Sequence, residues 1–204
     1  MILGIGSIAL DTTRTPFKTV ERIFGGAAAF FSISASHFTE VAVMGAVGSD
    51  FPARHLALLH KMGVDTRGGV KLRGKTMFFD SEFSFDLYAR KVRATELNVY
   101  LDYEPAVPDG LKSPDYLYLG TLEPGKQLSV LKQCSRPKFV LMDTIEFYIE
   151  TQRDKLLKTI SEADGMVLND IEARMLCRQA NLFKCARQIQ DWGPELVVIK
   201  KGEN

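Results

Sequence analysis

Hydrophobic positions along most of the chain alternate between short continuous runs and segments with helical spacing. Ile2–Ile8 and Val41–Val47 are apolar without polar alternation, which is typical of strands covered on both faces. Ala27–Phe38 carries small and aromatic residues at helical spacing, and Pro52–Met62 repeats apolar residues on one face before a stop at Gly63. The pattern therefore predicts strands that alternate with helices.

The same alternation continues through the rest of the chain. The predicted strands are Tyr116–Leu119, Phe139–Met142, Met166–Leu168 and Leu196–Ile199. The predicted helices run from Pro124 to about Cys134 and over Arg153–Ala163, Asp170–Cys177 and Leu182–Trp192. Such alternation predicts an α/β fold, with a Rossmann-like, mostly parallel sheet and helices on both faces.

One stretch, from about Val70 to Tyr103, breaks this rhythm. It is rich in β-forming residues without helical period, and charged and polar residues interleave with them. This pattern is typical of antiparallel strands with one wet face, set apart from the parallel sheet. We therefore predict a small β-sheet lid from about residues 11–20 and 70–103, on a single α/β domain spanning residues 1–204.

Composition and charge narrow the class of protein. The chain is 46% hydrophobic and 25% charged, as globular proteins are, and its formal charge of +1 gives no reason to expect a nucleic-acid or membrane partner. Its N-terminus reads as a buried strand rather than a signal peptide. Neither the three cysteines nor the three histidines have metal-ligand or disulfide spacing, which favours structural roles and a reduced, cytoplasmic compartment. These residues are Cys134, Cys177 and Cys185, and His37, His55 and His60.

The first glycines resemble a dinucleotide-binding fingerprint. Gly4-Ile-Gly6-Ser-Ile-Ala9 fits GxGxxG/A after a strand, but that motif functions only where a helix follows. Leu10–Pro16 contains three threonines and a proline, which favour extended structure instead. The acidic residue expected about 20 positions later is also absent. An oxidoreductase is therefore disfavoured, and the chain contains no GxxxxGK[ST] phosphate loop.

A pair of glycines opens a predicted helix. Gly25 and Gly26 permit backbone torsions and close approaches that a side chain would forbid, and exposed amides at a helix start can bind hydroxyl or anionic groups. A plain strand-to-helix turn explains the pair equally well. Similarly, Asn169 and Glu172 fit an N-cap with its capping-box partner three residues later.

Taken in order, the motifs resemble those of the ribokinase-like (PfkB) kinases. The sequence has Asp11 at the expected end of the first strand, then Gly25-Gly26, GAVGSD at residues 45–50 and LHKMGVD at residues 59–65. Later segments also correspond: Asp143 at a strand end, the NxxE-like NDIE at residues 169–172, and VVIKKG at residues 197–202. The resemblance covers the whole chain, and the conjunction is more specific than any single motif.

The resemblance implies transfer of the γ-phosphoryl group of ATP, with Mg²⁺, to a hydroxyl of a sugar or nucleoside. It implies that Asp11, Gly25, Gly26, Phe30 and Asp143 bind the acceptor substrate. It further implies that Asn169, Glu172, Lys200 and Gly202 bind the nucleotide, Glu172 contacting Mg²⁺ indirectly. In this family lid strands often pair between subunits, so a homodimer through the lid is expected.

The chain departs from the family pattern in two ways. Phe30 stands where an asparagine commonly contacts the sugar, which indicates a different or less polar acceptor pocket. No segment matches the family's GxGD, whose aspartate is the catalytic base, so we expect the base beyond Asn204 and a C-terminal part that is missing. This chain is therefore expected to be inactive alone. The alternative is a non-catalytic sugar- or nucleoside-binding protein that associates through the lid.

Overall fold

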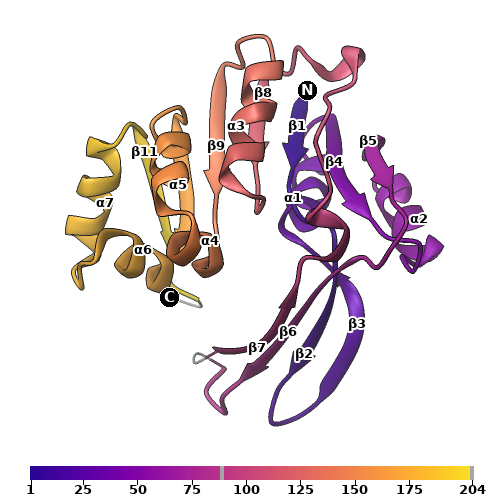
Figure 1. The fold of residues 1–204 in the computed structure, drawn as a ribbon, viewed down its shortest axis with the longest axis horizontal. Helices are drawn as coiled ribbons and strands as arrows, with labels where there is room; N and C mark the ends of the chain where they lie inside the picture. Colours follow the sequence, from indigo (N-terminus) through magenta and orange to yellow (C-terminus); the bar gives the residue numbers. More distant parts are fainter. Residues whose placement is uncertain (88–89, 203–204) are drawn as a thin grey trace. The chain divides into compact units, whose positions relative to one another are not determined.

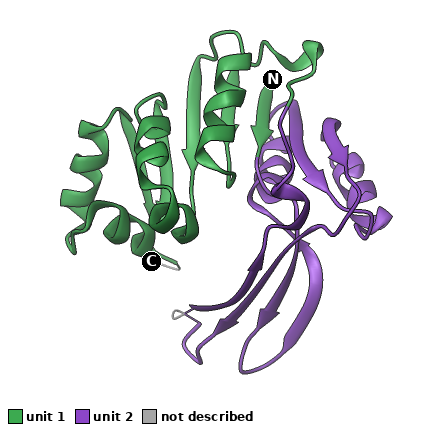
Figure 2. Ribbon diagram, viewed as in Figure 1, with its two compact units in different colours: residues 1–5, 106–204 green, residues 6–105 purple. Residues whose placement is uncertain are grey.

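The structure is a computed structural model that describes residues 1–87 and 90–202. The chain divides into two compact units, coloured separately in Figure 2. Unit 1 comprises Met1–Ile5 and Ala106–Asn204, and unit 2 comprises Gly6–Pro105.

Seven strands form the larger sheet in the order β11-β10-β9-β8-β1-β4-β5. Four further strands form a smaller sheet in the order β3-β2-β6-β7 (Figure 1). These observations confirm the predicted α/β class, with a mostly parallel sheet and a small separate β-sheet. None of the described helices has the length and apolar character needed to cross a bilayer.

Unit 1 consists of five parallel strands and five α-helices. Its strands are β1 (Ile2–Ile5), β8 (Tyr116–Leu119), β9 (Phe139–Asp143), β10 (Gly165–Asn169) and β11 (Leu196–Lys200). Its helices are α3 (Pro124–Gln133), α4 (Glu146–Thr151), α5 (Arg153–Ile160), α6 (Asp170–Cys177) and α7 (Leu182–Asp191), with a 3-10 turn η2 (Asp109–Leu111). The continuous apolar runs form these strands because parallel strands need cover on their faces.

The two faces of the unit 1 sheet differ sharply. Alternate side chains point to opposite faces, and the register places Leu117, Met142 and Met166 on one face, where all are at most 1% exposed. The other face carries Tyr116 and Leu196, which remain 47% and 48% exposed. Most of the fully buried strand side chains of unit 1 therefore lie on one face of the sheet, although Tyr118, on the other face, is only 6% exposed.

Unit 2 contains two helices, two strands of the larger sheet and the whole smaller sheet. Its elements are β2 (Ala9–Arg14), β3 (Thr19–Gly25), α1 (Ala27–Ser36), β4 (Val41–Val47), α2 (Ala53–Lys61), β5 (Asp65–Lys71), β6 (Met77–Phe83), β7 (Arg90–Glu96) and the 3-10 turn η1 (Asn98–Tyr100). A core of Ile8, Ala28, Ala29, Val43, Leu59 and Val64 joins α1 and α2 to β4. Small alanines on α1 let that helix approach β4 closely.

Several predictions for unit 2 need correction. The predicted strand Ile2–Ile8 ends at Ile5, and Asp11 lies inside the separate strand β2 rather than at the end of the first strand. β2 pairs with β6 in parallel, so the lid is a mixed sheet, although β6 and β7 are antiparallel as predicted. Val99 and Tyr100 lie in a buried 3-10 turn rather than on a strand, and their side chains are 5% and 6% exposed.

Candidate functional site

Asp11 lies on β2, the second strand of the smaller sheet. Its neighbours in register are Ile23 on β3 and Phe79 on β6. Its Oδ1 atom is buried and has no hydrogen-bond partner among the described residues. Burial raises the pKa of Asp11 to about 6, because the ionised form loses water without gaining a donor. A carboxylate in this condition is ready to accept a hydrogen bond from a ligand.

Neighbouring atoms leave no room for a side chain at Gly25 or at Gly26. A Cβ on Gly25 would lie 2.1 Å from Asp11 Oδ2, so the Asp11 carboxylate rests directly on the backbone of β3. Gly26 has φ +103, and a Cβ there would lie 2.3 Å from the carbonyl oxygen of Ser7. The structure thus brings three of the predicted acceptor residues together at the start of α1, where Gly26 is the N-cap.

Ser7 binds two of the backbone N–H groups at the start of α1, which the sequence had suggested as ligand-binding groups. Its hydroxyl accepts a hydrogen bond from the Ala27 N–H at 3.0 Å, and its carbonyl accepts one from the Ala28 N–H at 3.1 Å. These two amides are therefore satisfied within the protein, and the sequence alone did not indicate this.

Phe30 lies on the first turns of α1 and is 57% exposed. Its ring centroid is 6.2 Å from that of Phe24 on β3. Phe24 in turn stacks on His55, with 5.1 Å between ring centroids, and lies 6.1 Å from Phe51. Phe30 is consequently the exposed end of an aromatic cluster that begins beside Gly25.

In unit 1, Asp143 ends β9 and is 9% exposed. Its carboxylate accepts hydrogen bonds from the Tyr118 hydroxyl at 3.2 Å and from the Thr144 N–H at 2.7 Å. Burial raises the pKa of Asp143, and Lys200, the Thr144 amide and Tyr118 partly oppose that shift. The fully buried Gln127 donates to the Asp143 carbonyl at 2.9 Å and fixes the end of this strand.

Asn169 and Glu172 form the capping box that their spacing predicted. Asn169 Oδ1 accepts from the Glu172 N–H at 2.8 Å, and Glu172 Oε2 accepts from the Asn169 N–H at 2.7 Å. Lys200 pairs in register with Asn169 on the neighbouring strand and is exposed. Gly202 follows in a turn with φ +67, and a Cβ there would meet nothing within 4 Å.

The carboxylates of these segments bear on whether Mg²⁺ could bind here. Within the described chain no three His, Cys, Asp or Glu residues gather closely enough to hold a metal ion. Glu172 is 4% exposed and already accepts a hydrogen bond with one oxygen. A direct coordination shell is therefore not present, whereas Mg²⁺ that keeps its waters requires only one or two carboxylates.

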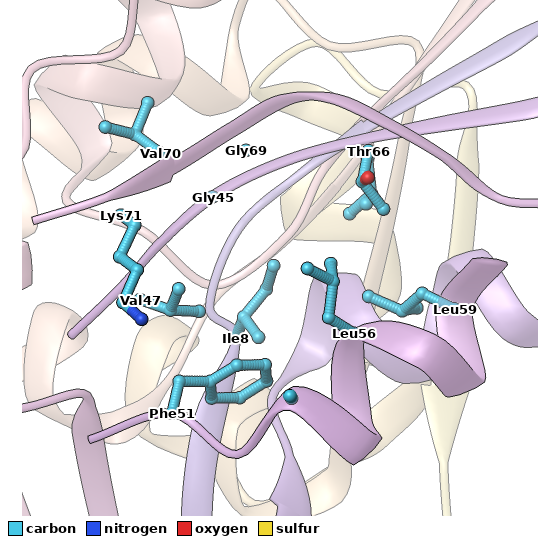
Figure 3. Close-up of a pocket in the computed structure, with 12 residues that line it drawn as sticks. Ile8, Gly45, Val47, Phe51, Leu56, Leu59, Thr66, Gly69, Val70 and Lys71 are labelled. Carbon is cyan, nitrogen blue, oxygen red and sulfur yellow. The ribbon is translucent and has the colours of Figure 1, made fainter. Parts of the chain in front are cut away.

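An apolar cavity of about 240 Å³ lies between α2 and the strands β4 and β5 (Figure 3). Ile8, Val47, Phe51, Leu56 and Leu59 form much of its wall, and Lys71 is the single charged residue among those that line it. None of the predicted site residues lines this cavity. It is therefore distinct from the Asp11 group.

One contributor to the Asp11 region was not anticipated from sequence. The buried hydroxyl of Tyr100 accepts from the N–H groups of Ile8 and Ala46 and donates to the Gly6 carbonyl at 2.8 Å. These bonds tie the turn before β2 to β4. Only the apolar neighbours of Tyr100 in sequence hint at its burial, and they do not reveal its partners.

Comparison with known proteins adds a relationship in sequence and one in fold. No model of a known protein family matches the chain. A cytidine kinase of Thermococcus kodakarensis is 28% identical over 210 residues, covering 99% of this chain and 73% of that kinase.

Two solved structures show the fold similarity. A nucleoside kinase of Burkholderia thailandensis in complex with inosine superposes with a TM-score of 0.75 at 16% identity, over 100% of this chain and 71% of that chain. A nucleoside kinase of Methanocaldococcus jannaschii, an archaeal member of the ribokinase family, has a TM-score of 0.73 at 15% identity, over 98% and 70% of the respective chains. The chain therefore has the ribokinase-like fold, and the resemblance to ribokinase-like kinases that its motifs indicated is confirmed.

Proposed function

We propose that this chain binds a nucleoside or sugar through Asp11 and serves in transfer of the γ-phosphoryl group of ATP to a hydroxyl of that acceptor. The observation that carries the proposal is the buried, unpartnered Oδ1 of Asp11 beside Gly25 and Gly26. A buried carboxylate oxygen without a donor is unfavourable, and hydroxyl groups of a bound sugar would supply the donors.

A nucleoside is the acceptor that we favour. The relatives named above include a cytidine kinase and a nucleoside kinase bound to inosine. Phe30, where the family commonly has an amide, also presents an exposed ring that packs beside Phe24. An aromatic ring can stack on the flat face of a nucleobase, which a free sugar lacks.

For the donor side we propose Asn169, Glu172, Lys200 and Gly202 as the nucleotide group of unit 1. Lys200 would supply positive charge to the phosphates, and the turn at Gly202 would leave room for the nucleotide. Mg²⁺, when bound, would neutralise phosphate charge. Glu172 would contact that ion through water, consistent with the absence of a direct ligand cluster among the described residues.

The role of Asp143 is less direct than that of Asp11. Both of its oxygens already accept hydrogen bonds from protein groups. We propose that it orients the end of β9 and lends charge near Lys200 rather than receiving acceptor hydroxyls. No GxGD segment lies in the 204 residues, so we expect these residues to bind substrate without rapid turnover.

Calorimetric titration with cytidine, inosine and ribose tests the proposal. We expect the chain to bind at least one nucleoside and Asp11→Ala to weaken that binding at least about 100-fold. Asp65→Ala is the matched control, because Asp65 pairs only locally with Arg67 on β5. The proposal fails if no compound binds the folded chain, or if Asp11→Ala binds as tightly as the control.

A further inference from the structure

β3 carries an extra residue opposite β2 just beyond Asp11. Asp11 pairs with Ile23 and Thr13 pairs with Val20, so Glu21 and Arg22 together face Thr12. This is a β-bulge, which bends a strand and re-aims a side chain. Arg22 has φ 50, a left-handed conformation that non-glycine residues adopt only when other contacts hold it.

Two contacts with neighbouring strands hold Arg22 in the bulge. The Arg22 N–H donates to the hydroxyl of the buried Thr12 at 3.3 Å. Its guanidinium lies over the ring of Phe78 on β6, 5.9 Å from the centroid. The Arg22 side chain therefore reaches across β2 toward the strand on its other side.

The stronger contact is with Asp50, the aspartate of the GAVGSD motif. Arg22 Nη2 donates to Asp50 Oδ2 at 2.6 Å. Asp50 Oδ1 accepts from both the N–H and the hydroxyl of Thr76, each at 2.7 Å. One carboxylate thus joins the bulge of β3 to Thr76, the residue that precedes β6.

The turn that carries Asp50 is also hydrogen-bonded to the segment that precedes β6. The Gly48 N–H donates to the Thr76 hydroxyl oxygen at 2.9 Å, and the Ser49 N–H donates to the Gly74 carbonyl at 2.9 Å. A Cβ on Gly48 would lie 2.4 Å from the Gly74 carbonyl oxygen. Thr76 is 1% exposed, so these bonds are shielded from water.

This cluster does not touch the acceptor group directly. Leu10, Phe24 and Phe78 share one face of the smaller sheet, and Arg22 packs on that face. Asp11 belongs to the other face, together with its register partner Ile23. Any influence on Asp11 must therefore pass through the pairing of the strands.

We propose that Asp50 is a positioning residue, which holds β3 and β6 in register on either side of β2 and so keeps the Asp11 carboxylate over Gly25. The proposal rests on the proposed function in that Asp11 is the acceptor ligand. Because side chains alternate between faces, even a small shift of β3 would move Gly25 away from Asp11. The GAVGSD motif then acts on the acceptor from the opposite face of the sheet.

Two variants test the proposal, with a matched control. Asp50→Asn keeps an oxygen for Thr76 and removes the charge that holds Arg22, and Arg22→Met removes the guanidinium. Arg14→Met is the control, because Arg14 makes a comparable ion pair with Asp80 in the same sheet, at 3.0 Å. We expect hydrogen exchange at Ile23–Gly25 to quicken about tenfold in both test variants, and in the double variant no further.

A second readout separates positioning from a purely structural role. The Kd for the nucleoside that binds the unaltered chain should rise about tenfold in Asp50→Asn and Arg22→Met, and not in Arg14→Met. Equal exchange in test and control variants would overturn the proposal, as would faster exchange with unchanged affinity.

The two proposals can also fail separately. If no nucleoside binds the unaltered chain, a carboxyl NMR titration of Asp11 decides, since it needs no ligand. Loss of the Asp50–Arg22 ion pair should let water reach Asp11 and return the pKa of Asp11 toward its ordinary value. An Asp11 pKa that is the same in Asp50→Asn and in Arg14→Met would overturn the positioning role.

Discussion

Unit 2 and unit 1 both contain carboxylates with buried oxygens, Asp11 in unit 2 and Asp143 and Glu172 in unit 1, but the hydrogen-bond partners of these carboxylates differ. Asp11 Oδ1 has no donor among the described residues, whereas Asp143 accepts two hydrogen bonds and Glu172 closes a capping box. Burial raises the pKa of both Asp11 and Asp143, yet only Asp143 has donors that oppose the rise. Burial alone therefore does not mark a binding residue. We therefore base the proposed acceptor site on the Oδ1 atom of Asp11, which has no donor among the described residues.

The largest effect should come from closing the space beside Asp11. In Gly25→Ala the new Cβ would overlap Asp11 Oδ2, and the overlap can be relieved only by moving β3 or the carboxylate. We expect a loss of about 3 kcal/mol or more in the free energy of unfolding, together with loss of nucleoside binding.

Gly63→Ala is the matched substitution, because Gly63 has φ +74 but meets nothing within 4 Å. It should cost only about 1 kcal/mol, the cost of the backbone conformation. Urea unfolding of both variants makes the comparison. Equal losses would mean that the contact with Asp11 is not tight.

Asp11→Asn should stabilise the protein while it weakens acceptor binding. The pKa of Asp11 is about 6 in the folded chain, above its ordinary 3.8, so the folded state holds the proton more tightly than the unfolded state. The free energy of unfolding therefore falls as pH rises from about 4 to about 6, and it stays lower above that range. Asn carries no such proton, so we expect the variant to be more stable by about 1 to 3 kcal/mol at pH 7.

Thermal unfolding at pH 4 and at pH 7 measures this difference. At pH 4 the variant and the unaltered chain should differ little, because Asp11 is then protonated in the folded state. A variant that is less stable at pH 7 would show that Asp11 has a protein donor.

The smallest effect should come from the nucleotide group. Glu172→Ala removes one half of the capping box on α6 and should cost about 1 kcal/mol in the free energy of unfolding. Nucleoside binding in unit 2 should be unchanged. Calorimetry with the nucleoside makes that check, and a tenfold loss would contradict the division of roles between the two groups.

Much of the fold was predictable because local signals agree with tertiary packing in unit 1. The strand Tyr116–Leu119 and the helix Asp170–Cys177 were predicted with their observed bounds. β5 was missed, because Asp65–Lys71 is polar, contains two glycines and lies at the edge of its sheet. α4 was missed because six residues give too little periodicity.

The motifs supplied the candidate site residues, but they did not reveal the surroundings of these residues. The burial of Asp11 depends on the parallel pairing of β2 with β6, which joins segments far apart in the chain. The bulge at Arg22 leaves no mark in the sequence, and the Asp50 carboxylate that the Arg22 side chain contacts lies 28 residues away along the chain. The use of the α1 amides by Ser7 is likewise a tertiary contact.

The apolar residues of the predicted lid differ widely in their exposure. Among the apolar residues of the predicted lid segment, Met77 is 6% exposed, whereas Phe85 is 77% exposed and its ring centroid lies 5.5 Å from that of Phe17. A homodimer through the lid remains a prediction.

We propose that Asp11, whose Oδ1 atom has no donor among the described residues, accepts hydrogen bonds from the hydroxyl groups of the acceptor. The measurement that tests it most directly is an NMR titration of the Asp11 side-chain carboxyl, without and with a saturating nucleoside. We expect the pKa of Asp11 to be about 6 in the free chain and to fall clearly when the nucleoside binds, because hydroxyl donors stabilise the ionised form. An Asp11 pKa that begins near 4, or that does not change when the nucleoside binds, would contradict it.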